Sequence, residues 1–171
     1  MPGMRVQLGV LGGVIALWGF AGLCACGPPD QAIATSINVE TVGRAGGVLV
    51  GQGDLANVQL SVPFGALSQD TPLALGVDPA PPPPPPGLAP ASASVLLSPE
   101  GLALAKPATL FLPYTGLSDV SLYTAPAIAG ATWQPFDGGQ ADPSENVIRA
   151  SIPHFSRWCA FRPAVDVADG G

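Results

Sequence analysis

Short apolar runs, rather than helical stripes, dominate the chain after residue 38. In residues 58–62 apolar and polar positions alternate strictly, so Val58, Leu60 and Val62 share one face of a strand. Further runs of apolar or β-branched residues follow, at 73–77, 94–97, 108–112, 120–123, 132–136, 147–152 and 155–161. Turn-forming residues separate these runs, and no apolar stripe of 3.6-residue period persists for three turns. The pattern predicts an all-β antiparallel sandwich of about eight strands.

A run of prolines interrupts the strand pattern. Proline fixes φ and lacks an N–H group, so the run favours polyproline II and cannot extend a sheet. We therefore expect residues 78–93 to form a protruding loop between strands. Two interpretations are open: a tolerated low-complexity spacer, which we favour, and a docking ligand for a proline-binding groove of a partner. The docking candidates are Pro81, Pro82, Pro83, Pro84, Pro85 and Pro86.

The N-terminal segment has a different pattern, that of an export signal. Arg5 is the only charged residue before Asp30, and residues 6–23 are apolar with five glycines. A short positive region, an apolar region and small residues at its end are typical of a signal peptide. A permanent transmembrane helix is disfavoured, because glycine weakens a helix and no positive flank follows the segment.

The end of this segment, Leu23-Cys24-Ala25-Cys26-Gly27, resembles a bacterial lipobox. The register fits Cys26, since Leu23 lies three positions before it and Ala25 directly before it. The resemblance implies a lipoprotein signal peptide at residues 1–25. It also implies a mature Cys26 that carries diacylglycerol and an N-acyl chain such as palmitate, which together anchor a protein stably. Gly27 in place of Asp favours the outer membrane of a Gram-negative bacterium. The alternative is an ordinary signal peptide with incidental cysteines.

Composition narrows the choice of partners. Without residues 1–25, five basic side chains remain against all twelve acidic ones, so the net charge moves from −6 to −7. Such a chain is poorly suited to nucleic acid or to anionic headgroups. Cys159 would be the only thiol left, which excludes an intramolecular disulfide. We expect a tether at 26–37, one domain at 38–163 and a flexible tail at 164–171.

Several sequence blocks carry a family resemblance. In chain order they are Gly46-Gly47-Val48-Leu49 with Pro63-Phe64-Gly65-Ala66-Leu67, then Leu97-Ser98-Pro99-Glu100-Gly101 with Lys106-Pro107-Ala108-Thr109-Leu110-Phe111-Leu112-Pro113-Tyr114, and last His154-Phe155-Ser156-Arg157-Trp158. These blocks resemble the ZU-five domain, a β-sandwich module of ankyrins and netrin receptors. The resemblance spans residues 46–163 and implies an interaction or scaffolding module. The chain lacks ankyrin repeats and a death domain, so spectrin binding and death signalling are not expected.

The block that begins at Pro63 also has a local explanation. Pro63 is expected to end a strand, because it cannot donate to the ladder, and Gly65 to supply a turn conformation that a Cβ would hinder. Ala66 and Leu67 are then expected to fold back onto the core.

The single histidine raises the question of self-cleavage. His154 stands two residues before Ser156, and positions i and i+2 of a strand share a face while Phe155 points to the opposite one. Ser156 Oγ could attack the Phe155 carbonyl, an N-to-O acyl shift would give an ester, and water would hydrolyse it. His154 would serve as base or as acid for the leaving amine. Some relatives of the ZU-five family cleave themselves at this tripeptide. The simpler interpretation is a last core strand in which Phe155 fills the sandwich.

The last strand also carries Cys159, which we expect in the core beside Phe155 and Phe161. Arg157 shares that face in an ideal strand, which requires either a bulge or a partly exposed face.

Other chemistry finds little support in the sequence. One histidine excludes a metal site built on paired imidazoles, and no P-loop, zinc, nucleophile-elbow or dinucleotide motif is present. Residues 137–146 lack EF-hand spacing, so a hairpin turn is expected there rather than a calcium site. We predict a non-enzymatic, exported lipoprotein without cofactors other than the lipid of Cys26. Its expected partners are the membrane and an unidentified protein or cell-envelope component, not nucleic acid or a small-molecule substrate.

Overall fold

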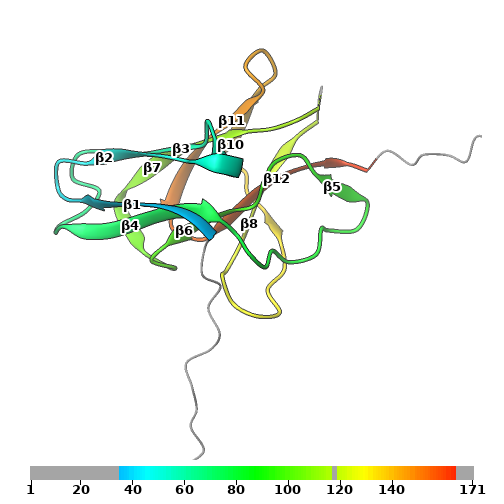
Figure 1. The fold of residues 1–171 in the computed structure, drawn as a ribbon. Helices are drawn as coiled ribbons and strands as arrows, with labels where there is room; N and C mark the ends of the chain where they lie inside the picture. Colours follow the sequence, from blue (N-terminus) through cyan, green and yellow to red (C-terminus); the bar gives the residue numbers. More distant parts are fainter. Residues whose placement is uncertain (1–34, 117–118, 165–171) are drawn as a thin grey trace, which may run out of the picture.

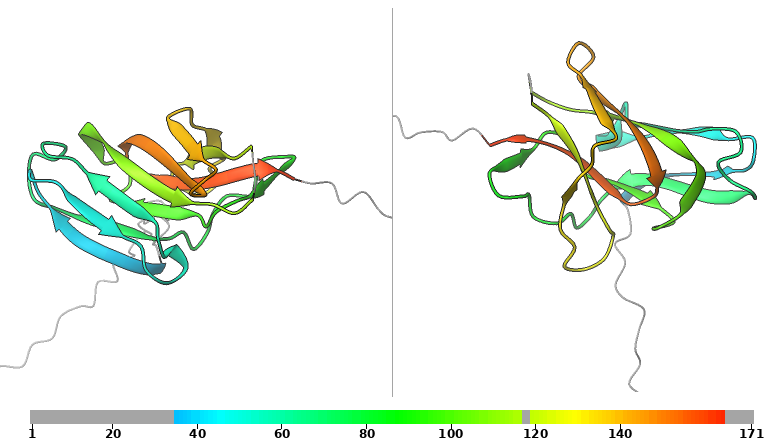
Figure 2. Two further views of the ribbon diagram at one scale, coloured as in Figure 1. Left: turned by 90° about the horizontal axis from the view of Figure 1, so that it is seen from above. Right: turned by 180° about the vertical axis from the view of Figure 1, so that it is seen from behind.

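The described chain folds as two antiparallel β-sheets packed face to face, as Figure 1 and the two further views in Figure 2 show. The computed structural model describes residues 35–116 and 119–164. Twelve strands and one 3-10 helix, Gly53–Leu55, lie within them, so the predicted all-β antiparallel sandwich is confirmed with more strands than expected. The predictions for residues 1–25, for Cys26 and for most of the tether and tail lie outside the described residues.

The larger sheet, sheet A, has its strands in the order β1-β4-β6-β12-β8-β9, and β5 also pairs with β12. Its strands are β1 (Thr35–Val42), β4 (Thr71–Val77), β5 (Leu88–Pro90), β6 (Val95–Ser98), β8 (Ser121–Ala125), β9 (Gln134–Pro135) and β12 (Arg157–Pro163). Because β1 begins at Thr35, the sandwich starts earlier than the expected boundary at residue 38.

The smaller sheet, sheet B, has the order β10-β11-β7-β3-β2. Its strands are β2 (Gly47–Val50), β3 (Gln59–Val62), β7 (Ala103–Pro113), β10 (Gly139–Asp142) and β11 (Val147–His154). The hairpin expected within residues 137–146 is confirmed as the β10–β11 pair. Its turn is held by Asp142 Oδ1, which accepts hydrogen bonds from the Ser144 N–H and hydroxyl.

The main core lies between the two sheets and follows the strand alternation. Val58, Leu60 and Val62 are all buried, as the period of two predicted. The largest fully buried side chains of this core are Leu49, Leu55, Leu60, Leu73, Leu75, Leu97, Leu110, Leu112, Phe155 and Trp158.

The β3–β4 connection follows its local prediction. β3 ends at Val62, directly before Pro63, and Gly65 adopts a φ of 77°, a conformation that side chains rarely allow. Ala66 and Leu67 are buried in the main core. The neighbouring β1–β2 turn uses Gly46 at φ 79°, where a Cβ would lie 2.3 Å from the Val62 carbonyl oxygen.

The two sheets come together along one side of the sandwich. β1 is an outer strand of sheet A and β2 is an outer strand of sheet B, and Figure 1 shows them side by side. Asn38 Nδ2 donates a hydrogen bond to the Val50 carbonyl oxygen at 2.8 Å, which ties the two edges together. The opposite side of the sandwich is bordered by β9 and β10.

The proline run does not protrude freely, contrary to the expectation. Pro82 is buried, and the Trp133 indole N–H donates a hydrogen bond to the Pro82 carbonyl oxygen at 2.9 Å. Pro85 is half-buried while the four other prolines of the run are exposed, a period of three residues. Polyproline II has three residues per turn, so one face of the run lies against the protein and two faces meet solvent.

Beneath the proline run lies a second apolar cluster, on the face of β12 that points away from the main core. It consists of Ala125, Trp133, Cys159 and Phe161, with Leu88 and Tyr123 packed against it. Trp133 and Tyr123 both meet the Phe161 ring edge to face, with centroids 5.4 and 5.2 Å apart. Residues 78–93, which we call the proline segment, therefore cover the outer face of sheet A, because that face is too apolar to be left in water.

Candidate functional site

Residues 154–156, which the sequence selected for chemistry, lie where the chain passes from one sheet to the other. His154 is the last residue of β11 in sheet B, and Arg157 is the first residue of β12 in sheet A. Phe155 and Ser156 connect the two strands and belong to neither. The shared strand face that was expected to bring His154 to Ser156 is therefore not formed, since the strand ends between them.

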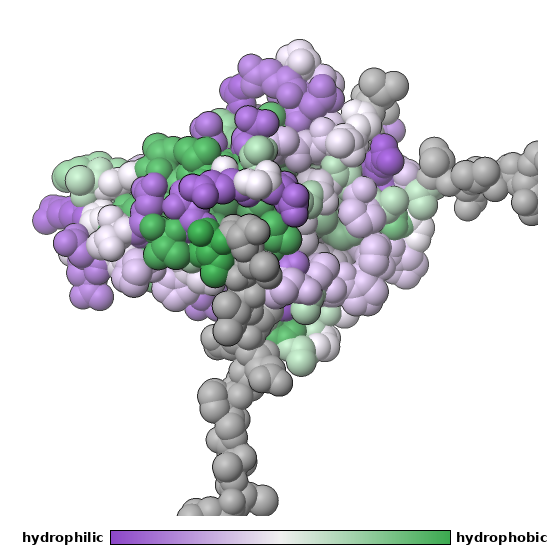
Figure 3. Space-filling model, in the orientation of Figure 1, coloured by the Kyte–Doolittle hydropathy of each residue, from purple (hydrophilic) through white to green (hydrophobic). Residues whose placement is uncertain are grey.

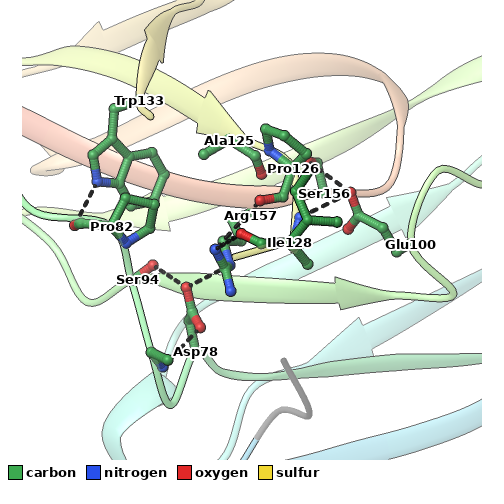
Figure 4. A network of polar contacts seen from close by, with 12 residues as sticks. Asp78, Pro82, Ser94, Glu100, Ala125, Pro126, Ile128, Trp133, Ser156 and Arg157 are labelled. Carbon is green, nitrogen blue, oxygen red and sulfur yellow. Dashed lines mark hydrogen bonds and ion pairs between the residues drawn. The ribbon is translucent and has the colours of Figure 1, made fainter. Parts of the chain in front are cut away.

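Ser156 is buried and its hydroxyl is used inside the fold. Its Oγ donates to the Ala125 carbonyl oxygen at 2.6 Å and lies 3.5 Å from Glu100 Oε1 (Figure 4). Glu100 Oε1 also accepts the Ala127 N–H at 3.1 Å, and Glu100 Oε2 is buried without a hydrogen-bond partner within the described part of the chain. Sequence reasoning missed Glu100 as a neighbour of Ser156, because 56 residues separate them.

His154 packs against an aromatic ring instead of Ser156. It is half-buried, and its ring centroid lies 5.9 Å from that of Trp158 at an angle of 45°. No hydrogen bond joins His154 to Ser156 in the described structure. The base that the sequence proposed is thus not hydrogen-bonded to the proposed nucleophile within the described residues.

Phe155 behaves as predicted for a core residue. Its side chain is fully buried in the main core. Its N–H donates to the Leu102 carbonyl oxygen at 3.0 Å, and its own carbonyl oxygen accepts the Gly101 N–H at 2.9 Å. The peptide group that self-cleavage would attack therefore has one backbone donor at its carbonyl oxygen.

Arg157 lies on the buried outer face of β12 and has a charged partner there, Asp78. Its side chain is 4% exposed, and its Nε lies 3.0 Å from Oδ2 of Asp78, whose side chain is fully buried. The Arg157 N–H is not well aligned for a hydrogen bond at this contact, so the interaction is mainly an ion pair. A buried charge requires such a partner, and this partner removes the need for a bulge or an exposed face.

The ion pair also joins three segments of the chain (Figure 4). Arg157 Nη1 reaches the carbonyl oxygens of Pro126 and Ile128, at 3.3 and 3.5 Å. Asp78 Oδ1 accepts the Ala80 N–H and its Oδ2 accepts the Ser94 hydroxyl, at 3.1 and 3.3 Å. The pair thus holds both ends of the proline segment and the β8–β9 loop against β12. The sequence signal that could have found it was an arginine at an apolar strand position.

Cys159 is buried in the second cluster beside Phe161, as expected, but Phe155 lies in the main core instead. Burial raises the pKa of the Cys159 thiol to about 11, against hydrogen bonds with Ser92 that act in the opposite direction. The thiol is therefore protonated near neutral pH and is a poor nucleophile.

A small apolar cavity lies next to this thiol. It measures about 260 Å³ and is lined mainly by the proline run, Trp133, Cys159 and Phe161. The polar groups at its wall already have partners: the Trp133 N–H bonds Pro82, and the Ser94 hydroxyl bonds Asp78. The polar side chains that line the cavity are therefore already engaged within the fold and are not free to orient a substrate.

Metal ligands are not gathered anywhere in residues 35–116 and 119–164: no three His, Cys, Asp or Glu side chains come together there. Nor does this part of the chain contain a helix long and apolar enough to cross a membrane.

Protein-family models do not match the chain, and no curated protein matches it significantly. The ZU-five resemblance consequently stays a prediction from the residues.

Proposed function

We propose that this protein is an exported lipoprotein, anchored through Cys26 in the outer membrane, that displays a ZU-five-like sandwich as a non-enzymatic interaction or scaffolding surface. The observation that carries the proposal is the order of two features along the chain. A lipobox-like sequence ends at Cys26, and the first strand of a folded sandwich begins at Thr35. The spacing leaves only a short tether between the proposed lipid and the domain.

The way the buried polar groups are used supports a display role over catalysis. Ser156, Arg157 and Asp78 each direct their polar atoms to partners within the fold. These contacts stabilise the packing of segments on sheet A. A catalytic group would instead need to face a space that a substrate can enter.

The anchor is tested by intact mass under denaturing conditions, on full-length protein extracted from the membranes of a Gram-negative host. We expect the mass of residues 26–171 plus diacylglycerol and one acyl chain. Cys26→Ala is expected to abolish the lipid, and Cys24→Ala serves as the matched control that keeps it. An unlipidated wild-type protein would contradict the proposal.

Self-cleavage at the Phe155–Ser156 bond remains a second candidate, favoured by two contacts. The Ser156 hydroxyl lies near the carboxylate of Glu100, and the Phe155 carbonyl oxygen already accepts the Gly101 N–H. A carboxylate near the hydroxyl and a donor at the developing oxyanion are both useful for acyl transfer. Against it stands the separation of His154 from Ser156.

The same mass measurement tests this candidate. Cleavage would give a lipidated species ending at Phe155 together with a peptide of residues 156–171. Ser156→Ala would abolish the split, while Ser151→Ala, at an exposed serine of β11, would leave it unchanged. An uncut wild-type chain would eliminate self-cleavage under those conditions.

The docking interpretation of the proline run takes a more specific form on the fold. Pro82 and Pro85 face the protein, so a partner groove could reach only Pro81, Pro83, Pro84 and Pro86. Deletion of the whole run is no longer a neutral test, because it would uncover the second apolar cluster. Substitution of Pro83 and Pro84 by Ala tests partner binding while keeping the cover.

A further inference from the structure

Four aliphatic side chains stand exposed on the two neighbouring edge strands. Ile37 and Val39 of β1 are 41% and 59% exposed, and Val48 and Val50 of β2 are 49% and 43% exposed. We refer to these four residues as the edge patch. Figure 3 shows apolar groups over the face that carries β1 and β2, on either side of a polar strip.

The strand alternation assigns these side chains to the outer surface of the sandwich. On β1 the buried core residue is Val42, and on β2 it is Leu49, whereas the edge-patch residues occupy the alternate positions. The hydrogen bond from Asn38 to the Val50 carbonyl oxygen keeps the two strands together, so the two pairs of side chains flank the same edge of the sandwich, Ile37 and Val39 on the outer face of sheet A and Val48 and Val50 on that of sheet B. Edge strands usually carry charge at such positions to prevent association. Exposed aliphatic residues here indicate a surface that another apolar phase covers.

The position of the edge patch in the chain points to the membrane as that phase. Cys26 and Thr35 are nine residues apart, which even a fully extended chain spans in at most about 30 Å. A lipid at Cys26 would therefore keep the start of β1 close to the bilayer, and Ile37 and Val39 follow at once. The patch itself contains no basic residue, so the contact would be apolar rather than electrostatic.

We propose that the edge patch rests in the boundary between headgroups and acyl chains, so that the anchored sandwich has one fixed orientation on the membrane. This inference rests on the proposed lipid anchor at Cys26. β1 and β2 then face the bilayer. The opposite side, bordered by β9 and β10, faces away from the membrane and is left accessible to a partner.

The orientation is tested with an environment-sensitive fluorophore placed on full-length, lipidated protein. Val39→Cys labels the edge patch, and Ile128→Cys is the matched control, an exposed aliphatic residue on the β8–β9 loop. The native Cys159 is buried and is not expected to react at neutral pH. The proteins are reconstituted into vesicles of phosphatidylethanolamine and phosphatidylglycerol with brominated acyl chains, and lipidation is verified by intact mass on the same samples.

We expect a blue-shifted emission at position 39 that the brominated acyl chains quench and that high salt does not alter. Position 128 should show neither the shift nor the quenching. Equal behaviour of the two positions in lipidated protein would overturn the inference and leave the anchor intact.

Two other outcomes would also overturn the inference. A blue shift at position 39 without quenching by brominated lipid would mean that protein covers the patch, for example a second copy of the chain. A mass without lipid would remove the proposed anchor and, with it, the reason for placing the patch on a membrane.

Discussion

Arg157 and Asp78 show how a single strand position is decided by a distant residue. Two buried charges lose their hydration, and their mutual attraction with further hydrogen bonds offsets that cost only while both partners are present. The pair lies between the main core and the cover of sheet A, with both side chains almost completely buried. Loss of the pair should therefore lower the free energy of unfolding, although neither residue takes part in a proposed function.

Removing one member of this pair should destabilise the sandwich more than removing both. Asp78→Asn leaves the buried guanidinium uncompensated, and we expect a loss of about 3–5 kcal/mol in the free energy of unfolding. The double variant Asp78→Asn, Arg157→Met should be less destabilised than the sum of its single variants. Urea denaturation of all four proteins measures this coupling. Additive effects would mean that the pair contributes only packing.

The Cys159 thiol gives the fold a dependence on alkaline pH. Its pKa is raised from an ordinary value of 9.0 to about 11 in the folded protein, so the unfolded chain loses this proton first as the pH rises. The stabilisation is complete below pH 9 and is lost between about pH 9 and 11, and it amounts to about 2–3 kcal/mol. Thermal unfolding across this range, with Cys159→Ala as the reference, isolates the thiol from the titration of other groups. Parallel pH curves for the two proteins would contradict the shift.

At the scale of the element, the proline segment covers the outer face of sheet A. Its polyproline II period directs one face toward Trp133 and Phe161, and β5 continues it into a pairing with β12. Such a segment needs no sheet partner for its own prolines, because they have no N–H groups to satisfy. The proline segment thus covers an apolar sheet face without a further strand or a helix.

The period of three makes a prediction for neighbouring prolines. Pro82→Ala removes a buried ring and should destabilise the protein by about 1 kcal/mol, whereas Pro83→Ala, at an exposed ring, should have an effect below about 0.5 kcal/mol. Trp133→Phe keeps an aromatic ring but removes the hydrogen bond to Pro82, at a cost of about 1 kcal/mol. Chemical denaturation measures all three changes. A free loop would make the two proline variants equivalent.

At the scale of the whole molecule, the strand order distributes stability unevenly. β7 lies inside sheet B and pairs with both β11 and β3, whereas β2 and β10 each pair on one side only. The side bordered by β1 and β2 also carries the exposed apolar residues of the edge patch. A bilayer against that side would bury the edge-patch residues, next to edge strands that pair on one side only.

Amide hydrogen exchange should reproduce this order. The N–H group of Leu110, at the point where β7 is paired with both β11 and β3, is expected to exchange slowest, near the rate set by global unfolding. The N–H groups at the free edges of β2 and β10 should exchange orders of magnitude faster, since local opening is sufficient there. If the protein is lipid-anchored and oriented as proposed, its amide exchange on vesicles should be slower at β2 than in solution and unchanged at β10. Uniform protection across sheet B would contradict the assigned strand order.

The local sequence determined much of what is found in the fold. Alternation predicted the buried face of Val58, Leu60 and Val62, and turn chemistry predicted the end of β3 at Pro63 and the positive φ of Gly65. These features depend on the period of the side chains and on backbone sterics within a few residues. These features can therefore be predicted from the local sequence, without knowledge of the rest of the chain.

Only the tertiary structure decided the features that depend on distant segments. It separated His154 from Ser156 by passing the chain between sheets, and it gave Arg157 its partner Asp78. It also turned the expected free proline loop into a cover for the outer face of sheet A, tied to Trp133. Sheet order and register set these contacts, and they follow from how all apolar faces are buried at once. No local pattern contains that information.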